Sequence, residues 1–411
     1  MMYVYHAGGP LSRKTGGPGL QGPDARRCAA ALFMRAVFRY ELSKHTPMGI
    51  TQKEIAEALK LPLITVSRAL NNSGYVSKAM KTRILDYAHD VRYVPLKASQ
   101  VLKRNKTRKI AVFSSSLPRY FWNDIHTGIV IGAEQIQPLN YQVNYHRIAE
   151  GNSDLYLERL EEEIRDGLEA VAFVNQWIYR MDRIISRITA AGIPFVTLNV
   201  DAPESRRLCY IGPDYHAGGR LAAEFIGKTM LFKGRARVLV LTTRPGSRAD
   251  PRAPDINALR YDGFREVMEK HFPAITHETV DITKGMRSPA AERQIAELLA
   301  ARRGGFDAAY MIPAYNSQFI RALEKAPDGR RIVVLHDLDS SSNHYLEKNL
   351  LTGVVYQNPI LQGYYAVKIL ENLLESGHPP GVRQINIVHS LILNENKDIY
   401  KNHYLFANMQ T

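Results

Sequence analysis

The stretch Ile50–Asn71, ITQKEIAEALKLPLITVSRALN, reads as two short helices joined by a tight turn. Thr51 and Glu54 have the T-x-x-E spacing of a capping box, in which each side chain bonds the backbone N–H of the other residue. Ile50 and Ile55 stand where a hydrophobic staple clamps the entry to a helix. The sequence therefore predicts a helix–turn–helix element with a well-defined start.

A third helix, with Ser77 as its cap, is expected to close a small core over this pair. Pro62 falls in the first turn of the second helix, where its missing N–H is tolerated. The apolar residues predicted to face the core are Ile55, Ala56, Leu59, Val66, Ala69, Leu70, Ile84, Leu85 and Ala88. The second helix leaves Leu63, Ile64, Thr65, Ser67 and Arg68 outward. A helical hairpin also occurs in ordinary all-helical cores, so charge has to separate the two interpretations.

Charge is distributed unevenly along the 411 residues, whose formal net charge is +14. Residues 1–40 hold 6 Lys and Arg against 1 acid, residues 41–110 hold 14 against 5, and the remainder holds 34 against 34. The whole excess therefore coincides with the helical unit and its flanking segments, as neutralisation of DNA phosphates requires. A nucleic-acid partner is favoured over a solvated basic face.

Four groups of residues carry a resemblance to the lac repressor family of bacterial regulators: TVSRALN at 65–71, Tyr75–Ser77, Tyr93–Pro95 and Leu102. The resemblance implies a helix–turn–helix headpiece over residues 48–95 and a hinge helix or linker over residues 96–108. In that family the second helix lies in the major groove, and a hinge leucine, here Leu102, wedges between base pairs in the minor groove. A simple basic linker is the alternative interpretation of the hinge segment.

The resemblance assigns DNA contacts residue by residue. Leu63 and Ile64 are expected to meet base edges, and Arg68, one turn later, a base or a phosphate. Contacts with the DNA backbone and the hinge-side groove are expected from Thr51, Thr65, Ser67, Asn71, Tyr75, Lys97 and Leu102. Lys60 replaces a frequent turn glycine, and Leu96 replaces a frequent asparagine, but neither departure breaks the scheme.

From about Lys109, short apolar runs alternate with amphipathic stretches of helical period. Each run is too short to span a membrane and too continuous for a half-exposed antiparallel strand, so buried parallel strands with crossover helices are predicted. The runs are IAVFS, VAFV, PFVTLN, ARVLVLTT, AAYMI, RIVVLHD and GVVYQ. An α/β region of about 300 residues is long enough for two lobes, each a doubly wound parallel sheet.

This region resembles the two-lobed, periplasmic-binding-protein-like effector domain of the same family, and is similar to ribose-type sugar-binding proteins. The motifs that carry the resemblance are S-L-x-x-x-F after the first run, R-x-x-G-F at 260–264, the aspartate that ends VVLHD and the glutamine after GVVY. All four fall at or after strand ends, where ligands bind in doubly wound sheets. They are expected to converge on one cleft for a small-molecule effector, which the resemblance makes a sugar or polyol.

The resemblance implies that Phe121 and Trp122 pack against a sugar ring and that Arg260 clamps hydroxyl groups. Further polar contacts are expected from Asn175, Asn199, Asp337 and Gln357, with Tyr315 or Asn316 as an additional contributor. Each has an alternative: a strand-end aspartate can cap a turn, Arg260 can pair with a nearby acid, and the two aromatic residues can be core. Asn199 replaces a frequent aspartate and Ala258 a second arginine, which leaves the effector's identity open.

Catalysis is not indicated, because the sequence has no G-x-S-x-G, H-E-x-x-H or phosphate-loop pattern and its 13 His show no metal spacing. No cofactor is expected. The run Glu161–Glu163 sits in the amphipathic stretch Leu155–Ile164 and is interpreted as a solvated helix face. The segment Gly212–Gly219, GPDYHAGG, lacks dinucleotide-binding spacing and is interpreted as a helix start. Cys28 and Cys209 offer no disulfide framework, as fits a cytoplasmic protein.

The expected domains are an extension (1–47), the headpiece (48–95), the hinge (96–108), the effector domain (109–395) and a tail (396–411). Lobe 1 is predicted from about 109–213 and 359–380, and lobe 2 from about 214–357 and 381–395. Two explanations of residues 1–47 stay open: a basic, disordered extension that adds DNA affinity, or a start codon assigned upstream of a true start at Met48. The apolar patch Cys28–Phe38, broken by Arg35, is neither a convincing signal peptide nor a membrane helix.

These features together predict a transcriptional regulator, a repressor by resemblance. It is expected to bind a palindromic operator as a homodimer and to change its affinity when an effector reorients the lobes. The alternative is a sugar-binding transport component with an incidental basic N-terminus. That class needs a secretory signal and lacks a headpiece, so the regulator is favoured.

Overall fold

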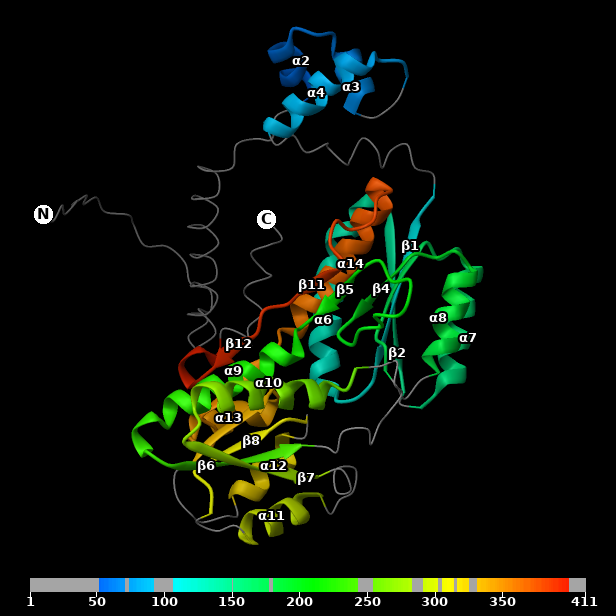
Figure 1. The fold of residues 1–411 in the computed structure, drawn as a ribbon. Coiled ribbons are helices and arrows are strands. Elements are labelled where there is room, and N and C mark those ends of the chain that lie inside the picture. The colour runs from blue at the N-terminus through cyan, green and yellow to red at the C-terminus, as the bar shows by residue number, and fades with distance from the viewer. Residues whose placement is uncertain are drawn as a thin grey trace, which may run out of the picture. The chain divides into compact units, whose positions relative to one another are not determined.

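The computed structural model describes residues 52–70, 74–91, 106–149, 151–176, 180–242, 254–282, 291–301, 305–313, 316–324 and 331–398. The chain divides into two compact units, residues 1–99 and 100–411, which Figure 1 colours in chain order. The predictions for Thr51, Asn71, Lys97, Leu102 and Tyr315 lie outside the described residues, as do those for residues 1–47 and 399–411.

In the described residues of the first unit lie three helices: α2 (Gln52–Leu59), α3 (Leu63–Leu70) and α4 (Lys78–Asp90). The predicted core is confirmed for Ile55, Ala56, Val66, Ala69, Ile84 and Ala88, which are buried, and for Leu59 and Leu70, which pack against them. Leu85 is 41% exposed, so its predicted place in the core is wrong. Ala88 shares a helix face with Ile84 four residues earlier, whereas Leu85 is turned about 100° away from it.

The turn between α2 and α3 passes through the left-handed region at Lys60, whose φ is 52°. This conformation suits glycine best, which is a physical reason for the turn glycine that Lys60 replaces relative to the family it resembles. The turn is closed by the backbone N–H of Leu61, which donates to the carbonyl of Ala56 at 2.9 Å. The start of α4 has the predicted cap, because the Ser77 hydroxyl oxygen accepts from the N–H of Met80 at 3.4 Å.

The second unit contains two sheets, the first of which forms lobe 1. Its strand order is β11-β5-β4-β3-β1-β2, with parallel pairs throughout. The strands are β1 (Arg108–Ser115), β2 (Tyr141–Ile148), β3 (Ala170–Phe173), β4 (Phe195–Leu198), β5 (Tyr210–Gly212) and β11 (Gln384–Asn386). The helices of this lobe are α6 (Arg119–Ile136), α7 (Ser153–Arg165), α8 (Met181–Ala190) and α14 (Pro359–Ser376), with a short 3-10 turn, η1 (Gln137–Leu139).

The second sheet forms lobe 2 and repeats this order as β12-β10-β9-β8-β6-β7, with only β12 antiparallel among these strands. Its strands are β6 (Ala236–Thr242), β7 (Ile275–Asp281), β8 (Ala308–Met311), β9 (Ile332–His336), β10 (Gly353–Tyr356) and β12 (Ser390–Ile392). Its helices are α9 (Tyr215–Thr229), α10 (Ile256–His271), α11 (Ala291–Ala301), α12 (Asn316–Glu324) and α13 (Ser340–Glu347), with 3-10 turns η2 (Leu231–Lys233) and η3 (Asn394–Asn396).

The seven apolar runs of the sequence are confirmed as β1, β3, β4, β6, β8, β9 and β10. The edge strands β2 and β7 were not predicted, because an edge is half-exposed and lacks a continuous apolar run. β5, β11 and β12 have three residues each, too few for a pattern. Because β11 pairs with β5, the predicted assignment of residues 381–395 to lobe 2 is wrong for residues 384–386 and holds for β12.

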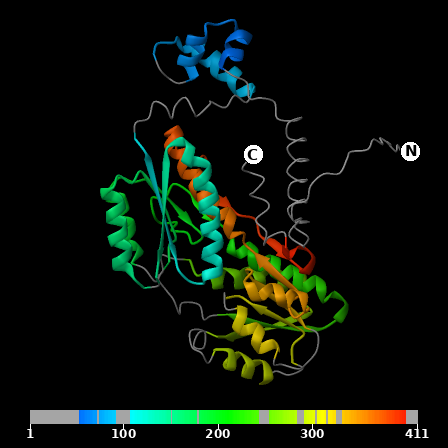
Figure 2. The ribbon, with the colours of Figure 1, turned by 180° about the vertical axis from the view of Figure 1, so that it is seen from behind.

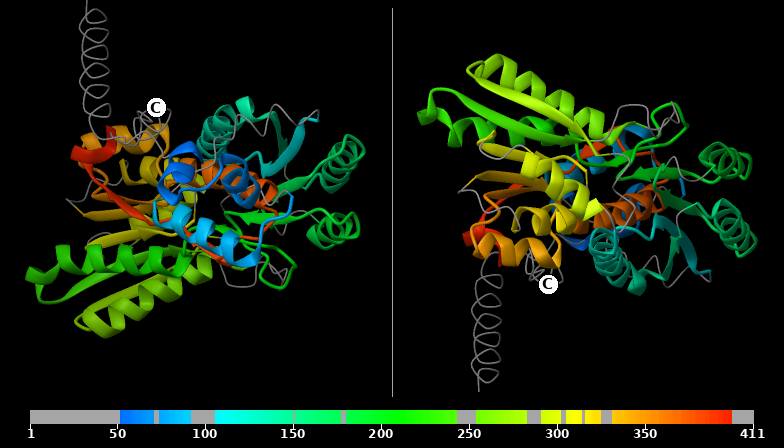
Figure 3. Two further views of the ribbon diagram at one scale, coloured as in Figure 1. Left: turned by 90° about the horizontal axis from the view of Figure 1, so that it is seen from above. Right: turned by 90° about the horizontal axis from the view of Figure 1, so that it is seen from below.

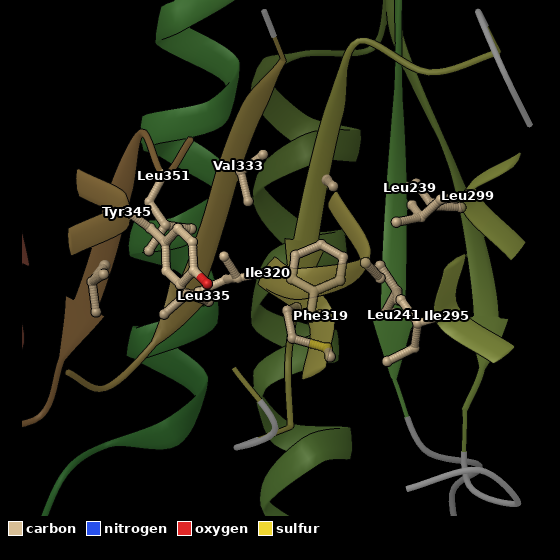
Figure 4. Packing of buried hydrophobic residues seen from close by; sticks show 14 of the residues in the cluster. Leu239, Leu241, Ile295, Leu299, Phe319, Ile320, Val333, Leu335, Tyr345 and Leu351 are labelled. Atoms are coloured by element: carbon tan, nitrogen blue, oxygen red, sulfur yellow. The ribbon is translucent and has the colours of Figure 1, made fainter. Parts of the chain in front are cut away.

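Each sheet lies between two layers of helices. In lobe 1, α6 and α14 pack on one face and α7 and α8 on the other, as Figure 2 shows. In lobe 2, α9 and α10 cover one face and α11, α12 and α13 the other (Figure 3). Figure 4 shows the core between the lobe 2 sheet and α11, α12 and α13. Phe319 and Ile320 of α12 belong to this core together with Leu335 of β9. Of the helices in the described part of the chain, none is long and apolar enough to cross a membrane.

The chain passes between the lobes three times: after β5, after β10 and between β11 and β12. The first passage enters α9 at its cap Asp214, whose carboxylate accepts from the N–H of Ala217 at 3.0 Å, which confirms the helix start predicted within 212–219. The second enters α14 at its cap Asn358. Both passages leave the carboxyl end of a parallel strand, so the carboxyl edges of the two sheets lie at the junction between the lobes.

Glycines allow the helices beside these passages to touch backbone to backbone. A Cβ atom at Gly219 of α9 would lie 1.9 Å from the carbonyl oxygen of Arg260 in α10, and one at Gly263 would lie 2.0 Å from the carbonyl oxygen of His216. Gly128 of α6 makes the equivalent approach to α14 in lobe 1. Only a residue without a Cβ fits such contacts. The position of Arg260 therefore depends on the close packing of α9 on α10.

Replacing Gly219 by alanine is expected to lower the free energy of unfolding by about 2–3 kcal/mol, because the added methyl group collides with backbone that cannot rotate away. Denaturant unfolding measures the difference. Gly381→Ala is the matched control, since a Cβ there meets no atom within 4 Å. Equal stability of the two variants would contradict the close approach of α9 and α10.

Candidate functional site

The outer face of α3 carries exposed apolar and basic side chains. Leu63 and Ile64, at its start, are 49% and 59% exposed, and Arg68 one turn later is exposed as well. Thr65 and Ser67 are partly exposed on the same helix. Large aliphatic side chains gathered beside a cation on a surface are typical of a binding site. Thymine methyl groups and phosphates are the DNA groups that match this chemistry.

A second exposed group follows α3. Tyr75 is 90% exposed, and Gly74 before it has a φ of 71°. The aliphatic part of Arg68 runs past Gly74, because a Cβ added there would lie 3.2 Å from the Arg68 Cδ. The predicted DNA-contacting residues in the described part of this unit are therefore all at least partly exposed, five of them on α3 and Tyr75 shortly after it.

Lobe 2 holds a buried guanidinium group at the junction. Arg260 lies in the second turn of α10, a helix capped by the carboxylate of Asp255. Its Nη1 donates to the carbonyl oxygen of Ile312 at 3.0 Å. Its guanidinium carbon lies 5.3 Å from the centre of the Tyr215 ring, within reach of a cation–π interaction. These contacts hold the side chain in one orientation.

Asp337 and Gln357 complete this group. Asp337 directly follows β9 with a φ of 65°, a left-handed conformation at the strand end. Its Oδ2 lies 4.0 Å from Nη2 of Arg260 and accepts from Nε2 of Gln357 at 2.8 Å. Burial raises the pKa of Asp337 to about 6, against the opposing effects of Arg260 and Gln357. The structure thus brings together Arg260, Asp337 and Gln357, all three of which were predicted ligand contacts. The nearby acid that pairs with Arg260 is Asp337.

Lobe 1 contributes Tyr120 and Asp124, one turn apart at the start of α6. Burial is the main cause that raises the pKa of both side chains, to about 7 for Asp124, and the negative charge of Asp337 adds to it. The charge of Asp337 in lobe 2 therefore acts on two ionisable side chains of lobe 1. We call Tyr120, Asp124, Arg260, Asp337 and Gln357 the interlobe cluster.

Several buried polar atoms, some after strand ends and others on α6 and α10, have no hydrogen-bond partner among the described residues. They are the Ser115 hydroxyl at the end of β1, the Tyr120 hydroxyl, Oε1 of Gln176 after β3, Nε of Arg260 and Oε1 of Gln357. A buried polar group without a partner costs about 1–3 kcal/mol. Such groups in both lobes, on segments that leave the strands or pack beside them, are consistent with a site for a polar ligand.

Phe121 and Trp122 lie elsewhere. Both belong to the core of lobe 1, where Trp122 is 2% exposed and its Nε1 donates to the carbonyl oxygen of Leu117 at 2.8 Å. Their rings meet edge to face with centres 5.1 Å apart. The structure therefore supports the core alternative, and the contact with a sugar ring stays a prediction. On this helix it is Tyr120 whose pKa the charge of Asp337 raises, and Tyr120 is turned by about 100° from Phe121.

Asn175 and Asn199 follow β3 and β4 as predicted, but both side chains are engaged within the protein. Nδ2 of Asn175 donates to the carbonyl oxygen of Asp201 at 2.7 Å. Nδ2 of Asn199 donates to Oε1 of Gln362 at 3.0 Å. A ligand contact by either residue stays a prediction. Asn316 begins α12, and its side chain lies outside the described part of the structure.

The glutamate run of α7 is not the uniformly solvated face that was predicted. Glu163 is buried, accepts from Nδ2 of Asn144 at 2.9 Å and lies 2.7 Å from Nε2 of His146. Glu161 forms an ion pair with Arg187 of α8 at 2.5 Å. A buried carboxylate is tolerated here because β2, on which α7 packs, presents polar partners.

Sequence reasoning missed Ser115, Tyr120, Asp124 and Gln176. Tyr120 and Asp124 are spaced i, i+4, which places them on one face of the predicted helix after the first strand, and this signal was available. The positions of Ser115 and Gln176 at strand ends were available too. Their lack of partners was not, because it depends on burial that only the folded chain defines.

Two family models match this chain. Residues 51–95 match the model described as bacterial regulatory proteins, lacI family. Residues 110–378 match the model described as periplasmic binding protein domain, which covers more than half of the chain. The first match coincides with the three-helix unit, and the second spans both lobes.

Similar proteins agree with both models. The chain is 24% identical over 313 residues to the "Probable HTH-type transcriptional repressor ExuR" of Bacillus subtilis (strain 168), covering 74% of this chain and 86% of that protein. It is 34% identical over 91 residues to the HTH-type transcriptional repressor CytR of Escherichia coli (strain K12), covering 22% and 27% of the two chains.

One solved structure illustrates the fold of the two lobes. A sugar-binding protein of a sugar ABC transporter from Bacillus halodurans matches with a TM-score of 0.61 and 20% identity, over 71% of this chain and 100% of that one. At this identity the likeness shows the fold alone. With a lacI-type helix–turn–helix unit ahead of a periplasmic-binding-protein domain, this chain belongs to the lacI family of bacterial regulatory proteins.

Proposed function

We propose that this regulator binds a sugar or related polyol at the interlobe cluster and a palindromic DNA operator as a homodimer. The observation that carries the ligand proposal is the set of buried polar atoms without partners among the described residues of both lobes. A polyhydroxylated molecule offers closely spaced donors and acceptors that can satisfy such a set. The sugar-binding protein that shares the fold of the lobes supports the same class of ligand.

The helical unit is proposed to read DNA with α3 in the major groove. Leu63 and Ile64 would meet thymine methyl groups, and Arg68 a base or phosphate. One such unit reads only a few base pairs, so useful specificity calls for two copies on a two-fold site. The lobes are the proposed source of the dimer contact, and the cytoplasm is the proposed location.

Ligand control follows from the placement of the cluster across the junction. A ligand that contacts both Asp337 in lobe 2 and α6 in lobe 1 favours one orientation of the lobes over others. Residues 96–108, the proposed hinge, join lobe 1 to the helical unit. In a dimer, reorientation would change the spacing of the two helical units and hence operator affinity. A role in transport is not favoured, because residues 51–95 match a family of regulatory proteins.

Replacing Arg68 by alanine is expected to weaken binding to a duplex selected from a random library about 10–100-fold, because a base or phosphate contact is lost. Fluorescence anisotropy at two salt concentrations measures the effect. Lys53→Ala removes the same charge from the exposed surface of α2, and is expected to weaken selected and scrambled duplexes equally. If Arg68→Ala behaved like Lys53→Ala, Arg68 would contact a phosphate and not a base. An affinity for the selected duplex equal to that of the parent would contradict the placement of α3 at the DNA.

Replacing Arg260 by alanine is expected to abolish the thermal shift that a sugar produces, since the buried guanidinium is the main cation of the cluster. The shift is measured with D-ribose, D-arabinose, D-galactose and myo-inositol, each relative to the melting temperature of the same variant without sugar. Arg265→Ala is the matched control, because Arg265 lies on α10 but is exposed and pairs with Asp262. A shift in Arg260→Ala as large as in the parent protein would place the ligand elsewhere.

A further inference from the structure

Asn199 and Gln362 form a buried hydrogen-bonded pair next to the interlobe cluster. Nδ2 of Asn199, after β4, donates to Oε1 of Gln362, on α14, at 3.0 Å. Nε2 of Gln362 donates in turn to the carbonyl oxygen of Gln357, after β10, at 2.9 Å. All three residues are buried. The two amide groups thus link the end of a lobe 1 strand to the end of a lobe 2 strand.

The same asparagine also holds the first passage between the lobes. Its carbonyl oxygen accepts from the hydroxyl of Tyr210 at 2.7 Å and from the hydroxyl of Tyr215 at 2.9 Å. Tyr210 lies in β5 of lobe 1, and Tyr215 is the first residue of α9 in lobe 2. Asn199 adopts a φ of 62°, which is uncommon outside glycine and shows that the surrounding contacts fix its backbone.

Both ends of this network reach residues of the cluster. Gln357, whose carbonyl accepts from Gln362, donates through its side chain to Asp337 at 2.8 Å. Tyr215, whose hydroxyl donates to Asn199, lies under the guanidinium of Arg260 at 5.3 Å. Two of the three passages between the lobes are therefore joined to Arg260 and Asp337 by one set of buried hydrogen bonds and a ring contact.

We infer that Asn199 and Gln362 are positioning residues that fix the orientation of the two lobes and hold Gln357 where a ligand meets it. The statement about the ligand rests on the proposed function, whereas the statement about orientation does not. Physically, a buried amide pair that spans two passages restricts their torsions, because every rotation breaks a hydrogen bond that water cannot replace. Neither residue needs to touch the ligand.

The test replaces Gln362 by methionine, which keeps the side-chain length and removes both hydrogen bonds. Gln135→Met is the matched control, since Gln135 accepts from the Tyr364 hydroxyl at 3.0 Å between α6 and α14 within lobe 1. Spin labels on Glu158→Cys and Lys270→Cys, at exposed sites of lobe 1 and lobe 2, report the distance between the lobes. The full chain carries Cys28→Ser and is diluted with unlabelled protein, so that only distances within one chain are measured by electron paramagnetic resonance.

The expected result is a broader or displaced interlobe distance distribution for Gln362→Met and an unchanged one for Gln135→Met. A distribution in Gln362→Met identical to that of the parent, with only the melting temperature lowered, would overturn the inference. Asn199→Asp serves as a second variant of nearly the same size. It has no donor for Oε1 of Gln362 and is expected to change the distribution in the same direction as Gln362→Met.

A binding measurement completes the test with the best binder among D-ribose, D-arabinose, D-galactose and myo-inositol. Gln362→Met is expected to raise its Kd at least tenfold, and Gln135→Met less than twofold. Equal Kd values for Gln362→Met and the parent would overturn the ligand part of the inference. If none of the four binds the parent protein, the proposed sugar class fails together with that part, and the distance measurement still decides the part on orientation.

Discussion

The buried ion pair of Arg260 and Asp337 is the interaction on which the proposed ligand site depends. The chain crosses between the two sheets three times within residues 106–398, and the carboxyl edges of both sheets lie at the junction between the lobes. A guanidinium and a carboxylate buried there need hydrogen-bond partners, because removal of one charge leaves the other buried without compensation. Tyr215, Gln357 and the carbonyl of Ile312 supply these partners, and the glycine contacts of α9 with α10 fix the helix that carries Arg260.

The arrangement explains why a regulator can use this fold as a sensor. The cluster takes residues from both lobes, so a ligand bound at this proposed site would contribute free energy to one relative orientation. The passages after β5 and after β10 are where torsions would change if the lobes reorient. Buried hydrogen bonds of Asn199 and Gln362 reach both of them. The helical unit, by contrast, has an outer face with Leu63 and Ile64 uncovered, so it is built for contact with a partner.

Much of this could be predicted from the sequence, because the strongest signals are local. The spacing of Ile55, Val66 and Ile84 fixed the core of the helical unit, and seven apolar runs became the central strands. Edge strands such as β2 were not predicted, since a half-exposed strand has no continuous apolar run. The roles of Phe121, Trp122 and Asn199 could not be derived from spacing. The same types of residue occur in a protein core and in a ligand site, and only the folded structure shows which groups surround them.

The most direct test of the account is the coupling between ligand and DNA, measured in both directions. The affinity for a duplex selected from a random library is titrated with and without the best-binding sugar, and the affinity for that sugar with and without the duplex. The account predicts a salt-sensitive duplex affinity that changes at least about fivefold with sugar, and the same factor in the reverse titration, because linkage is reciprocal. Tight binding of both partners with a factor of one in each direction would contradict it.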